Sequence, residues 1–495
     1  MYLGIDVGTG GTRALIVDER GGVLASATED HFPFASPQLG WAEQYPHDWW
    51  RACVGAIRSV VSQPGISAEQ IACIGFSGQM HGAVLLDRCD EMVRPAIIWC
   101  DQRTVEQVRE LAALFGSGEL IRLTCNPPLT NFTLTKLLWV RRNEPSNWKR
   151  VAHILLPKDY VRFRLTGERA TDVADASGTL LLDVARRIWS PEVLRRSEID
   201  PRLLPSLWES PEVCGRVSTR GAQETGLKAG TPVVAGAGDQ AAGAIGMGIV
   251  GPGIASATIG TSGVVFAATD VAVLDPLGRL HTFCHAVPGC WHVMGVTQAA
   301  GLSLRWFRDQ FAAGHSYDEL CNEAATAPPG CDGLVWTPYL MGERTPHNDP
   351  GARAALVGLS ASHTRAHVIR AILEGVAFSL KDSFTIFRKL DIPVQRIRLG
   401  GGGAQSRLWR QIQADVYGVT VEIVAAEEGA AYGAAILAGV GTGNWQSVDE
   451  ASGTIIRVAE EVRPDPSNAA ILDKSYGAFR EIYPALRPPG DIFRQ

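Results

Sequence analysis

The chain has 495 residues, of which 46% are hydrophobic and 20% charged, and its formal net charge is −6. One hydrophobic core does not extend over such a length, so we expect two domains, and the acidic balance argues against a nucleic-acid-binding protein, which needs a basic face. The 10 cysteines show no metal-binding spacing, and we find neither a signal peptide nor an apolar run long enough to cross a bilayer. These features predict a cytoplasmic protein without a membrane partner.

The chain begins with a pattern that predicts a β-hairpin. Apolar residues alternate with Gly4 and Asp6 in YLGIDV (2–7), so Asp6 lies on the face opposite the apolar one. GTGGT (8–12) is then the turn, and TRALIVDE (12–19) returns as the second strand. Backbone N–H groups of such a turn form an anion nest, and a carboxylate on the preceding strand is well placed to hold Mg²⁺. A plain hairpin turn is the alternative interpretation of this loop taken alone.

A single acid interrupts a later segment of small residues. Helix-like stretches around 47–62 and 104–114 alternate with strands at 71–78 and 96–99, which is typical of an α/β protein. The segment VVAGAGDQAAGAIG (233–246) then carries Asp239 with Gln240 beside it. The residues alone leave two interpretations open, a helix N-cap or a catalytic base at the back of a tight pocket. In the second case, the glycines and alanines around Asp239 would give a substrate room to approach.

A second hairpin is predicted over GIASATIGTSGVVFAAT (253–269), with GTSG (260–263) as its turn. Its similarity to the first hairpin indicates a duplicated domain, and the glycine-rich segment between Gly246 and Gly253 suits a hinge. The chain has no GxxxxGK[ST] motif, which excludes a P-loop. GTGGT does not open a helix, which makes a Rossmann dinucleotide site a poor fit.

A third glycine-rich element is RIRLGGGGAQSRLWRQIQADV (396–416). It predicts a strand, a tight turn and a helix that begins near Ser406, with Trp409 or Leu408, Ile412 and Val416 on its buried face. Four consecutive glycines cost backbone entropy, so we interpret the turn as a flat wall on which an adenine lies.

These features together resemble the actin/hexokinase/Hsp70 ATPase superfamily and, within it, the FGGY carbohydrate kinases, in particular the xylulokinases. The resemblance covers nearly the whole chain and is carried by the following motifs: GIDVGTGGTRA (4–14), GQMHG (78–82), IIWCDQRT (97–104), LLPKDYVRFRLTG (155–167), TDVADASGT (171–179), AGAGDQAAGA (235–244), TIGTSG (258–263), PYLMGERTPHND (338–349) and LGGGGAQSRLWRQIQAD (399–415).

The resemblance implies an α/β fold of two duplicated actin-like, ribonuclease H-like ATPase domains with a cleft between them. We expect an N-terminal domain over 1–246 with the sugar site and the first phosphate loop. A C-terminal domain over 247–440 would carry the second phosphate loop and the adenosine site. An extension over 441–495 would pack on the domains, with a tail that frays from about residue 488.

The resemblance also implies roles for single residues. Asp239 is the catalytic base and Asp6 the magnesium-associated acid. The expected sugar-binding residues are Met80, His81, Asp239, Gln240, Trp99 and Asp101. The expected nucleotide-binding residues are Thr9, Gly11, Thr12, Arg13, Thr261, Gly301, Gly401, Gly402 and Ser406. Glu343, Arg344 and His347 are interpreted as a structural ion-pair cluster at the domain interface.

The implied reaction is phosphoryl transfer from MgATP to D-xylulose, giving D-xylulose 5-phosphate in pentose catabolism. The expected partners are therefore a small sugar and MgATP, with no nucleic acid and no membrane, and a homodimer is left open. One alternative is the same chemistry on another ketose or polyol, such as D-ribulose or an alditol. A more distant alternative is an actin-like ATPase that does not act on sugars.

Overall fold

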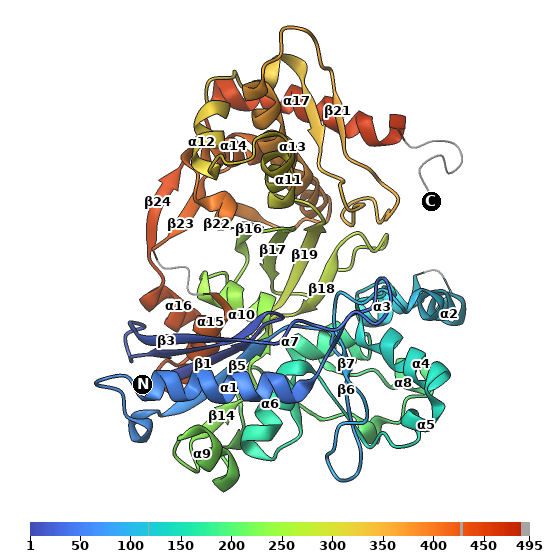
Figure 1. Cartoon of the computed structure of the whole chain (residues 1–495), viewed down its shortest axis with the longest axis vertical. Coiled ribbons are helices and arrows are strands. Elements are labelled where there is room, and N and C mark those ends of the chain that lie inside the picture. The colour runs from blue at the N-terminus through green and yellow to red at the C-terminus, as the bar shows by residue number, and fades with distance from the viewer. Residues whose placement is uncertain (117, 426–428, 487–495) are drawn as a thin grey trace.

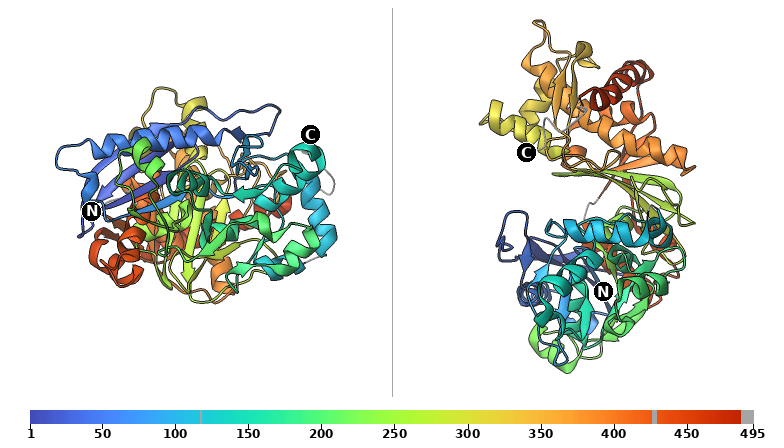
Figure 2. Two further views of the ribbon diagram at one scale, coloured as in Figure 1. Left: turned by 90° about the horizontal axis from the view of Figure 1, so that it is seen from below. Right: turned by 90° about the vertical axis from the view of Figure 1, so that its right-hand side faces the viewer.

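The computed structural model describes residues 1–116, 118–425 and 429–486, and it forms two lobes that each enclose a mixed β-sheet (Figure 1). A side view shows the lobes as two distinct bodies, one above the other (Figure 2). This arrangement confirms the predicted α/β fold of two duplicated units. The predicted fraying from residue 488 lies outside the described residues. Within the described ranges, no helix is both long and apolar enough to cross a membrane.

The first lobe is built on a sheet with the strand order β13-β14-β5-β1-β2-β3, to which β15 adds by pairing with β5. Its strands are β1 (Tyr2–Val7), β2 (Gly11–Val17), β3 (Val23–Asp30), β5 (Cys73–Gly78), β13 (Val213–Arg216), β14 (Pro232–Val234) and β15 (Ala237–Gly238). Strands β1 and β2 form the predicted antiparallel hairpin, and β1 runs parallel to β5.

Short strand pairs and helices surround this sheet. The pairs are β4 (Glu43–Gln44) with β7 (Ala96–Ile97), β6 (Val84–Leu86) with β8 (His153–Leu155), β9 (Ala170–Asp172) with β12 (Ser206–Trp208), and β10 (Leu182–Asp183) with β11 (Ile188–Trp189). The helices are α1 (Pro46–Val61), α2 (Val105–Phe115), α3 (Glu119–Thr124), α4 (Thr133–Asn143), α5 (Pro145–Trp148), α6 (Pro157–Thr166), α7 (Val173–Ala176), α8 (Pro191–Ser197), α9 (Thr219–Thr225) and α10 (Asp239–Gly246).

The second lobe repeats the sheet with the order β18-β19-β17-β16-β22-β23-β24. Its strands are β16 (Gly253–Ile259), β17 (Gly263–Thr269), β18 (His281–Cys284), β19 (Trp291–Thr297), β22 (Val394–Gly401), β23 (Val421–Val424) and β24 (Val458–Val462), with β20 (Val335–Thr337) and β21 (Ala355–Val357) as a separate pair. The later helices are α11 (Gly301–Phe311), α12 (Tyr317–Ala324), α13 (Arg365–Lys389), α14 (Arg407–Tyr417), α15 (Gly429–Gly441), α16 (Val448–Ile455) and α17 (Pro466–Leu486). Strands β16 and β17 are the second predicted hairpin.

Helix α15 returns from the second lobe and packs on the first sheet, beside β1 and β5 (Figure 1). The contact is too close for side chains. A Cβ atom on Gly4 would lie 1.9 Å from the Ala431 carbonyl oxygen, and one on Gly75 would lie 1.9 Å from that of Ala434. Glycine is therefore required at both strand positions, because any side chain would push the helix off the sheet. This helix lies within the segment predicted as the C-terminal domain.

Candidate active site

Asp239 lies at the junction of the two lobes. It is the first residue of α10 and directly follows β15, whose pairing with β5 fixes where the helix starts. The N-cap is Gly238, and no side chain caps the helix, so the N-cap interpretation of Asp239 is wrong. Asp239 and Gln240 line a cavity of about 170 Å³ together with Ser256 and Thr258 of the second lobe. The carboxylate therefore faces the space between the lobes.

The surroundings of Asp239 make its carboxyl group a stronger base than an ordinary aspartate. Burial and, after it, the negative charge of Asp6 raise the pKa of Asp239 to about 7. The Gln240 amide donates a hydrogen bond to Asp239 Oδ1 at 3.3 Å and partly opposes this rise. A general base works best with a pKa near the operating pH, so this electrostatic setting suits proton abstraction.

Met80 and His81 lie against the same segment. A Cβ atom on Gly238 would lie 2.7 Å from Met80 Cγ, so Met80 packs directly on the residue before Asp239. His81 donates its Nδ1 hydrogen to the Gly178 carbonyl oxygen at 2.7 Å, because a carbonyl oxygen only accepts. Burial lowers the pKa of His81 to about 3. The ring is therefore neutral near pH 7, and its Nε2 is a hydrogen-bond acceptor.

The small residues around Asp239 take part in close packing within the protein. Ala241 and Ala242 are 2% and 0% exposed, and a Cβ atom on Gly433 would lie 1.8 Å from the Ala242 carbonyl oxygen. Close packing of α10 on α15 thus requires glycine at position 433, Ala241 and Ala242 lie in the same buried cluster, and Met80 occupies the space beside Gly238. That these small residues also give a substrate room stays a prediction.

Two of the expected sugar-binding residues already have protein partners. The Trp99 side chain is 44% exposed, and its Nε1 donates to Thr9 Oγ1 at 2.9 Å. Asp101 is fully buried, and its carboxylate accepts hydrogen bonds from the Ala42 amide at 2.6 Å and from the Arg103 guanidinium at 2.7 Å. Trp99 therefore links the expected sugar side to the first loop, whereas Asp101 anchors an arginine. Sugar contacts of both residues stay predictions.

The first loop, residues 8–11, is held by side chains. Gln44 Nε2 donates to the Thr9 carbonyl oxygen at 2.8 Å, and Gln79 Nε2 donates to the Gly8 carbonyl oxygen at 3.3 Å. The Thr9 hydroxyl donates to Gln79 Oε1 at 3.3 Å and also accepts from Trp99. These bonds occupy the Thr9 hydroxyl and two loop carbonyls, and the Gly8 N–H donates to the Gly11 carbonyl oxygen at 3.0 Å. The donors left for an anion are therefore the other backbone N–H groups of the loop, and their contact with a phosphate stays a prediction.

The other residues expected in this loop lie around its strand β2. Thr12 is fully buried and hydrogen-bonds His31 Nε2 at 2.8 Å, and a Cβ atom on Gly11 would lie 2.8 Å from the Glu29 carbonyl oxygen. Arg13 Nε donates to Ser26 Oγ at 3.1 Å. These contacts stabilise the hairpin, and nucleotide contacts of the three residues stay predictions.

A cavity of about 510 Å³ opens in the second lobe beside the second loop. It brings together four of the expected nucleotide-binding residues, namely Thr261, Gly301, Gly402 and Ser406. Ser406 is the N-cap of α14, which confirms the predicted helix start, and it accepts a hydrogen bond from the Trp409 amide. Other residues line the cavity that were not among the predicted nucleotide-binding residues, including Arg305, Tyr317, Asp318, Cys321 and Gln405.

These additional residues differ in how well the sequence signals them. Arg305 follows Gly301 by four residues on α11, a spacing that places both on one helix face, so it was open to prediction. Tyr317 and Asp318 begin α12, which carries no glycine-rich motif. Gly401 is not among the cavity's lining residues; its φ is 70°, and a Cβ there would lie 2.6 Å from the Ile259 carbonyl oxygen.

The residues at the junction fit a magnesium ion bound mainly through phosphates and water. Asp6 Oδ1 is buried without a hydrogen-bond partner among the described residues, and burial raises the pKa of Asp6. No group of three or more candidate metal ligands occurs within the described ranges. Mg²⁺ commonly uses one or two carboxylates together with substrate phosphates rather than a full protein cage, so Asp6 is a suitable ligand.

The predicted ion-pair cluster in GERTPHND is wrong in its chemistry. Glu343 is 2% exposed and accepts hydrogen bonds from the Gln298 amide at 2.9 Å and from the Arg344 amide at 2.7 Å. No ion pair joins the Glu343 and Arg344 side chains within the described residues. His347 instead stacks on Tyr483, with ring centroids 3.7 Å apart. The segment is structural, but hydrogen bonds and ring contacts hold it.

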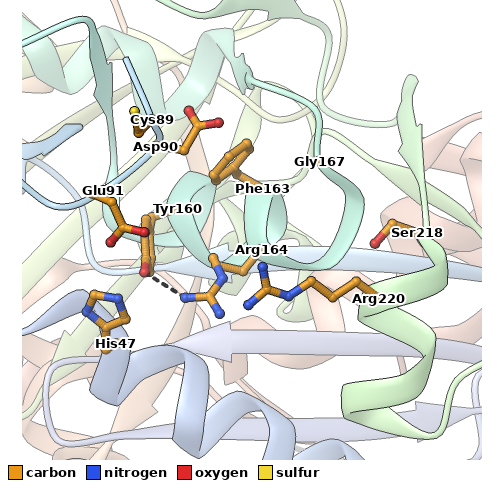
Figure 3. Close-up of a pocket in the computed structure, with 10 residues that line it drawn as sticks. All are labelled: His47, Cys89, Asp90, Glu91, Tyr160, Phe163, Arg164, Gly167, Ser218 and Arg220. Atoms are coloured by element: carbon orange, nitrogen blue, oxygen red, sulfur yellow. Dashed lines mark hydrogen bonds between the residues drawn. The ribbon is translucent and has the colours of Figure 1, made fainter. Parts of the chain in front are cut away.

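A separate hollow of about 480 Å³ lies between α6 and α9 in the first lobe (Figure 3). Its two arginines, Arg164 and Arg220, point toward one another, and Arg164 donates to the Tyr160 hydroxyl at 3.1 Å. Glu224 lies 2.7 Å from Arg220 and 3.9 Å from Arg164, so a carboxylate already balances them. None of the predicted site residues lines this hollow.

Comparison with known proteins agrees with this architecture. Residues 1–246 match the N-terminal domain of the FGGY family of carbohydrate kinases, and residues 255–442 match its C-terminal domain. The chain belongs to this family.

Relatives within the family resemble the chain over almost its full length. It is 40% identical to a xylulose kinase from Bacillus subtilis, covering 97% of this chain and 96% of the relative. It is 37% identical to a xylulose kinase from Escherichia coli, covering 99% of each. A solved xylulose kinase structure from Rhodospirillum rubrum superimposes with a TM-score of 0.93 at 33% identity, covering 98% of this chain and 99% of the other.

Proposed function

We propose that this carbohydrate kinase transfers the γ-phosphoryl group of ATP to a primary hydroxyl of D-xylulose, with Asp239 as the general base. The observation that carries the proposal is the position of Asp239, which faces the space between the lobes with a pKa raised to about 7. The relatives described above support the choice of sugar.

Asp239 and the residue pair beside it provide the acceptor side of the reaction. The Asp239 carboxylate takes the proton from the sugar hydroxyl as the new oxygen–phosphorus bond forms and ADP leaves. His81 Nε2 accepts a hydrogen bond from a sugar hydroxyl, and Met80 provides apolar contact. Because the phosphoryl transition state is loose, positioning and charge stabilisation dominate the catalysis.

The two loops and the adenosine cavity provide the donor side. The first loop offers backbone N–H groups, and the second loop adds the exposed hydroxyls of Thr261 and Ser262. Asp6 would hold Mg²⁺, which neutralises charge on the phosphates. In this proposal residues 1–246 bind the sugar, residues 247–440 bind the nucleotide, and closure of the lobes brings the two together.

A panel of acceptors tests the reaction. ADP release is measured with D-xylulose, D-ribulose, xylitol or no sugar, each with MgATP. D-xylulose should give the highest kcat/KM, and the rate without sugar should be low because water is a poorly positioned acceptor. A higher kcat/KM with D-ribulose or xylitol would move the enzyme to that substrate, and equal rates with and without every sugar would contradict a sugar kinase.

Substitution of Asp239 tests the role of the base. Asp239→Asn keeps the shape of the side chain but cannot accept a proton, so we expect kcat to fall by about 10²–10⁴-fold. The MgATP KM should change little. Asp449→Asn, on an exposed position of α16, is the matched control. An Asp239→Asn enzyme with kcat within threefold of the wild type would exclude Asp239 as the base.

A further inference from the structure

His81 has an unusual backbone conformation for a residue with a side chain. Its φ is 67°, in the left-handed region, where the Cβ atom of a non-glycine residue is crowded by the backbone. Such a conformation persists only where surrounding contacts enforce it. The strain falls on a residue expected to contact the sugar, so the contacts that enforce it bear on sugar binding.

Two side chains of α4 hold the His81 carbonyl group. Lys136 Nζ donates to the His81 carbonyl oxygen at 3.0 Å, and Thr133 Oγ1 donates to the same oxygen at 3.1 Å. Lys136 also donates to the Asn131 carbonyl oxygen. Thr133 and Lys136 are three residues apart, so they project from the same face of the helix. The helix thus fixes one peptide plane of the left-handed turn.

The His81 ring is fixed from the other side. Its Nδ1 donates to Gly178, and a Cβ atom at Gly178 would lie 2.6 Å from this nitrogen, so only glycine leaves space for the ring. The edge of Phe132 packs on the ring with centroids 5.0 Å apart. With Nδ1 occupied by its proton, the direction of the Nε2 lone pair depends on the backbone that Lys136 and Thr133 hold.

Burial of the Lys136 amino group costs free energy. It is fully buried, and burial lowers its pKa to about 7, although the nearby Asp101 charge opposes the change. An apolar side chain of similar length would fill the space without this desolvation cost. Both the ammonium and the neutral amine have enough N–H donors for the two carbonyl groups. Packing therefore does not account for Lys136, whereas its two carbonyl contacts do.

We propose that Lys136 is a positioning residue that holds the left-handed turn at His81 and so aims the His81 Nε2 lone pair at a hydroxyl group of the acyclic sugar. Thr133 assists it through the same carbonyl oxygen. This role rests on the proposed sugar kinase function. It adds a specificity element that lies behind the sugar site and does not touch the sugar.

The test is the sugar KM of variants that remove one donor each. Lys136→Met keeps the length of the side chain and removes both hydrogen bonds, and we expect the pentulose KM to rise about 10-fold, the equivalent of one lost hydrogen bond. Thr133→Val should raise it less, and Thr133→Ser, which keeps the hydroxyl, should restore the wild-type value. The kcat should fall by a smaller factor than the KM rises, since Asp239 is not displaced. Lys149→Met, on the exposed surface beyond α5, is the matched control.

A spectroscopic measurement separates positioning from loss of structure. Nitrogen-15 NMR of histidine-labelled protein reports the tautomer of His81, assigned with His81→Gln. The wild type should show the Nδ1-protonated form, and Lys136→Met should show a mixture of tautomers. If Lys136→Met does not fold, Thr133→Val and Thr133→Ser carry the test. The proposal is overturned if the wild type phosphorylates the pentulose and the folded Lys136→Met and Thr133→Val variants have pentulose KM values within twofold of the wild-type KM. A wild type without activity on the pentulose would instead overturn the proposed function.

Discussion

The two glycine-rich loops have the same hairpin fold but are supported in different ways. In the first loop, Gln44, Gln79 and Trp99 bind the Thr9 hydroxyl and the loop carbonyls. In the second loop, the support comes from the backbone, because the Ala300 and Leu302 amides donate to the Thr261 carbonyl oxygen at 3.0 and 3.1 Å. The Thr261 hydroxyl is exposed and has no partner among the described residues.

This difference indicates that the loops of the two duplicated halves have different roles. A loop whose side chains are already bonded presents a fixed row of N–H donors, which suits a charge that develops at a defined place. In the proposed function, a loop with free hydroxyls gains its hydrogen bonds only when the nucleotide binds. We therefore expect substitutions in the first loop to lower both the stability of the protein and the rate of the reaction. Substitutions in the second loop should weaken nucleotide binding alone.

The largest expected effect concerns the contacts between the two lobes. Asn126 of the first lobe donates to the Thr282 carbonyl oxygen of β18 at 2.7 Å and contacts His281 at 3.1 Å. Burial lowers the pKa of His285 to about 4 and holds the pKa values of His281 and His292 well below the usual value. Three neutral, fully buried histidines thus lie on or beside the strands that meet the first lobe.

These histidines predict loss of stability in acid. A folded pKa below the unfolded value of 6.5 means that the unfolded chain binds more protons, so the stabilisation is complete above pH 6.5 and is lost as the pH falls below it. Each of these histidines takes up a proton on unfolding below pH 6.5, so each weakens the folded state as the pH falls toward 5.5. Thermal unfolding midpoints measured from pH 7.5 to 5.5 should fall steeply.

A single substitution tests whether the buried histidines cause the loss of stability in acid. His292 stacks on Phe266 with centroids 4.3 Å apart, so His292→Phe keeps the aromatic packing and removes one titrating group. The decline of the midpoint with pH should become shallower, because one buried neutral histidine no longer takes up a proton on unfolding. The exposed His47→Gln serves as control. An unchanged slope in His292→Phe would show that carboxylates, not these histidines, cause the acid lability.

The second prediction breaks the support of the first loop. Gln79→Leu removes the hydrogen bonds to Gly8, Thr9 and Gln44, and a displaced loop should lower kcat/KM for MgATP by about 10²-fold. The unfolding midpoint should also fall, because buried acceptors lose their donors. Gln44→Leu should act in the same network, so the double variant should lose less than the sum of both. Full additivity would show that the two glutamines act independently.

The sequence predicted the parts of the site that depend on local patterns. Both hairpins, the strand–turn–helix around the four glycines and the N-cap at Ser406 follow from alternation and turn residues. It did not predict why residue 433 must be glycine, because its partner Ala242 lies on a helix about 190 residues earlier in the chain. The bonds that occupy Asp101 and the Thr9 hydroxyl were missed for the same reason, since their donors come from other elements.

The smallest expected effect tests the second loop against the first. Thr261→Ala removes a hydroxyl that has no protein partner in the described structure, so it should raise the MgATP KM by about 10-fold, through one lost hydrogen bond to the nucleotide, and leave the unfolding midpoint unchanged. Thr261→Ser should behave like the wild type. Thr9→Ala removes a hydroxyl bonded to Gln79 and Trp99, so it should lower the midpoint as well as the rate. Equal shifts of the unfolding midpoint in Thr9→Ala and Thr261→Ala would show that the two loops are supported alike. The inference that the two loops have different roles would then be wrong.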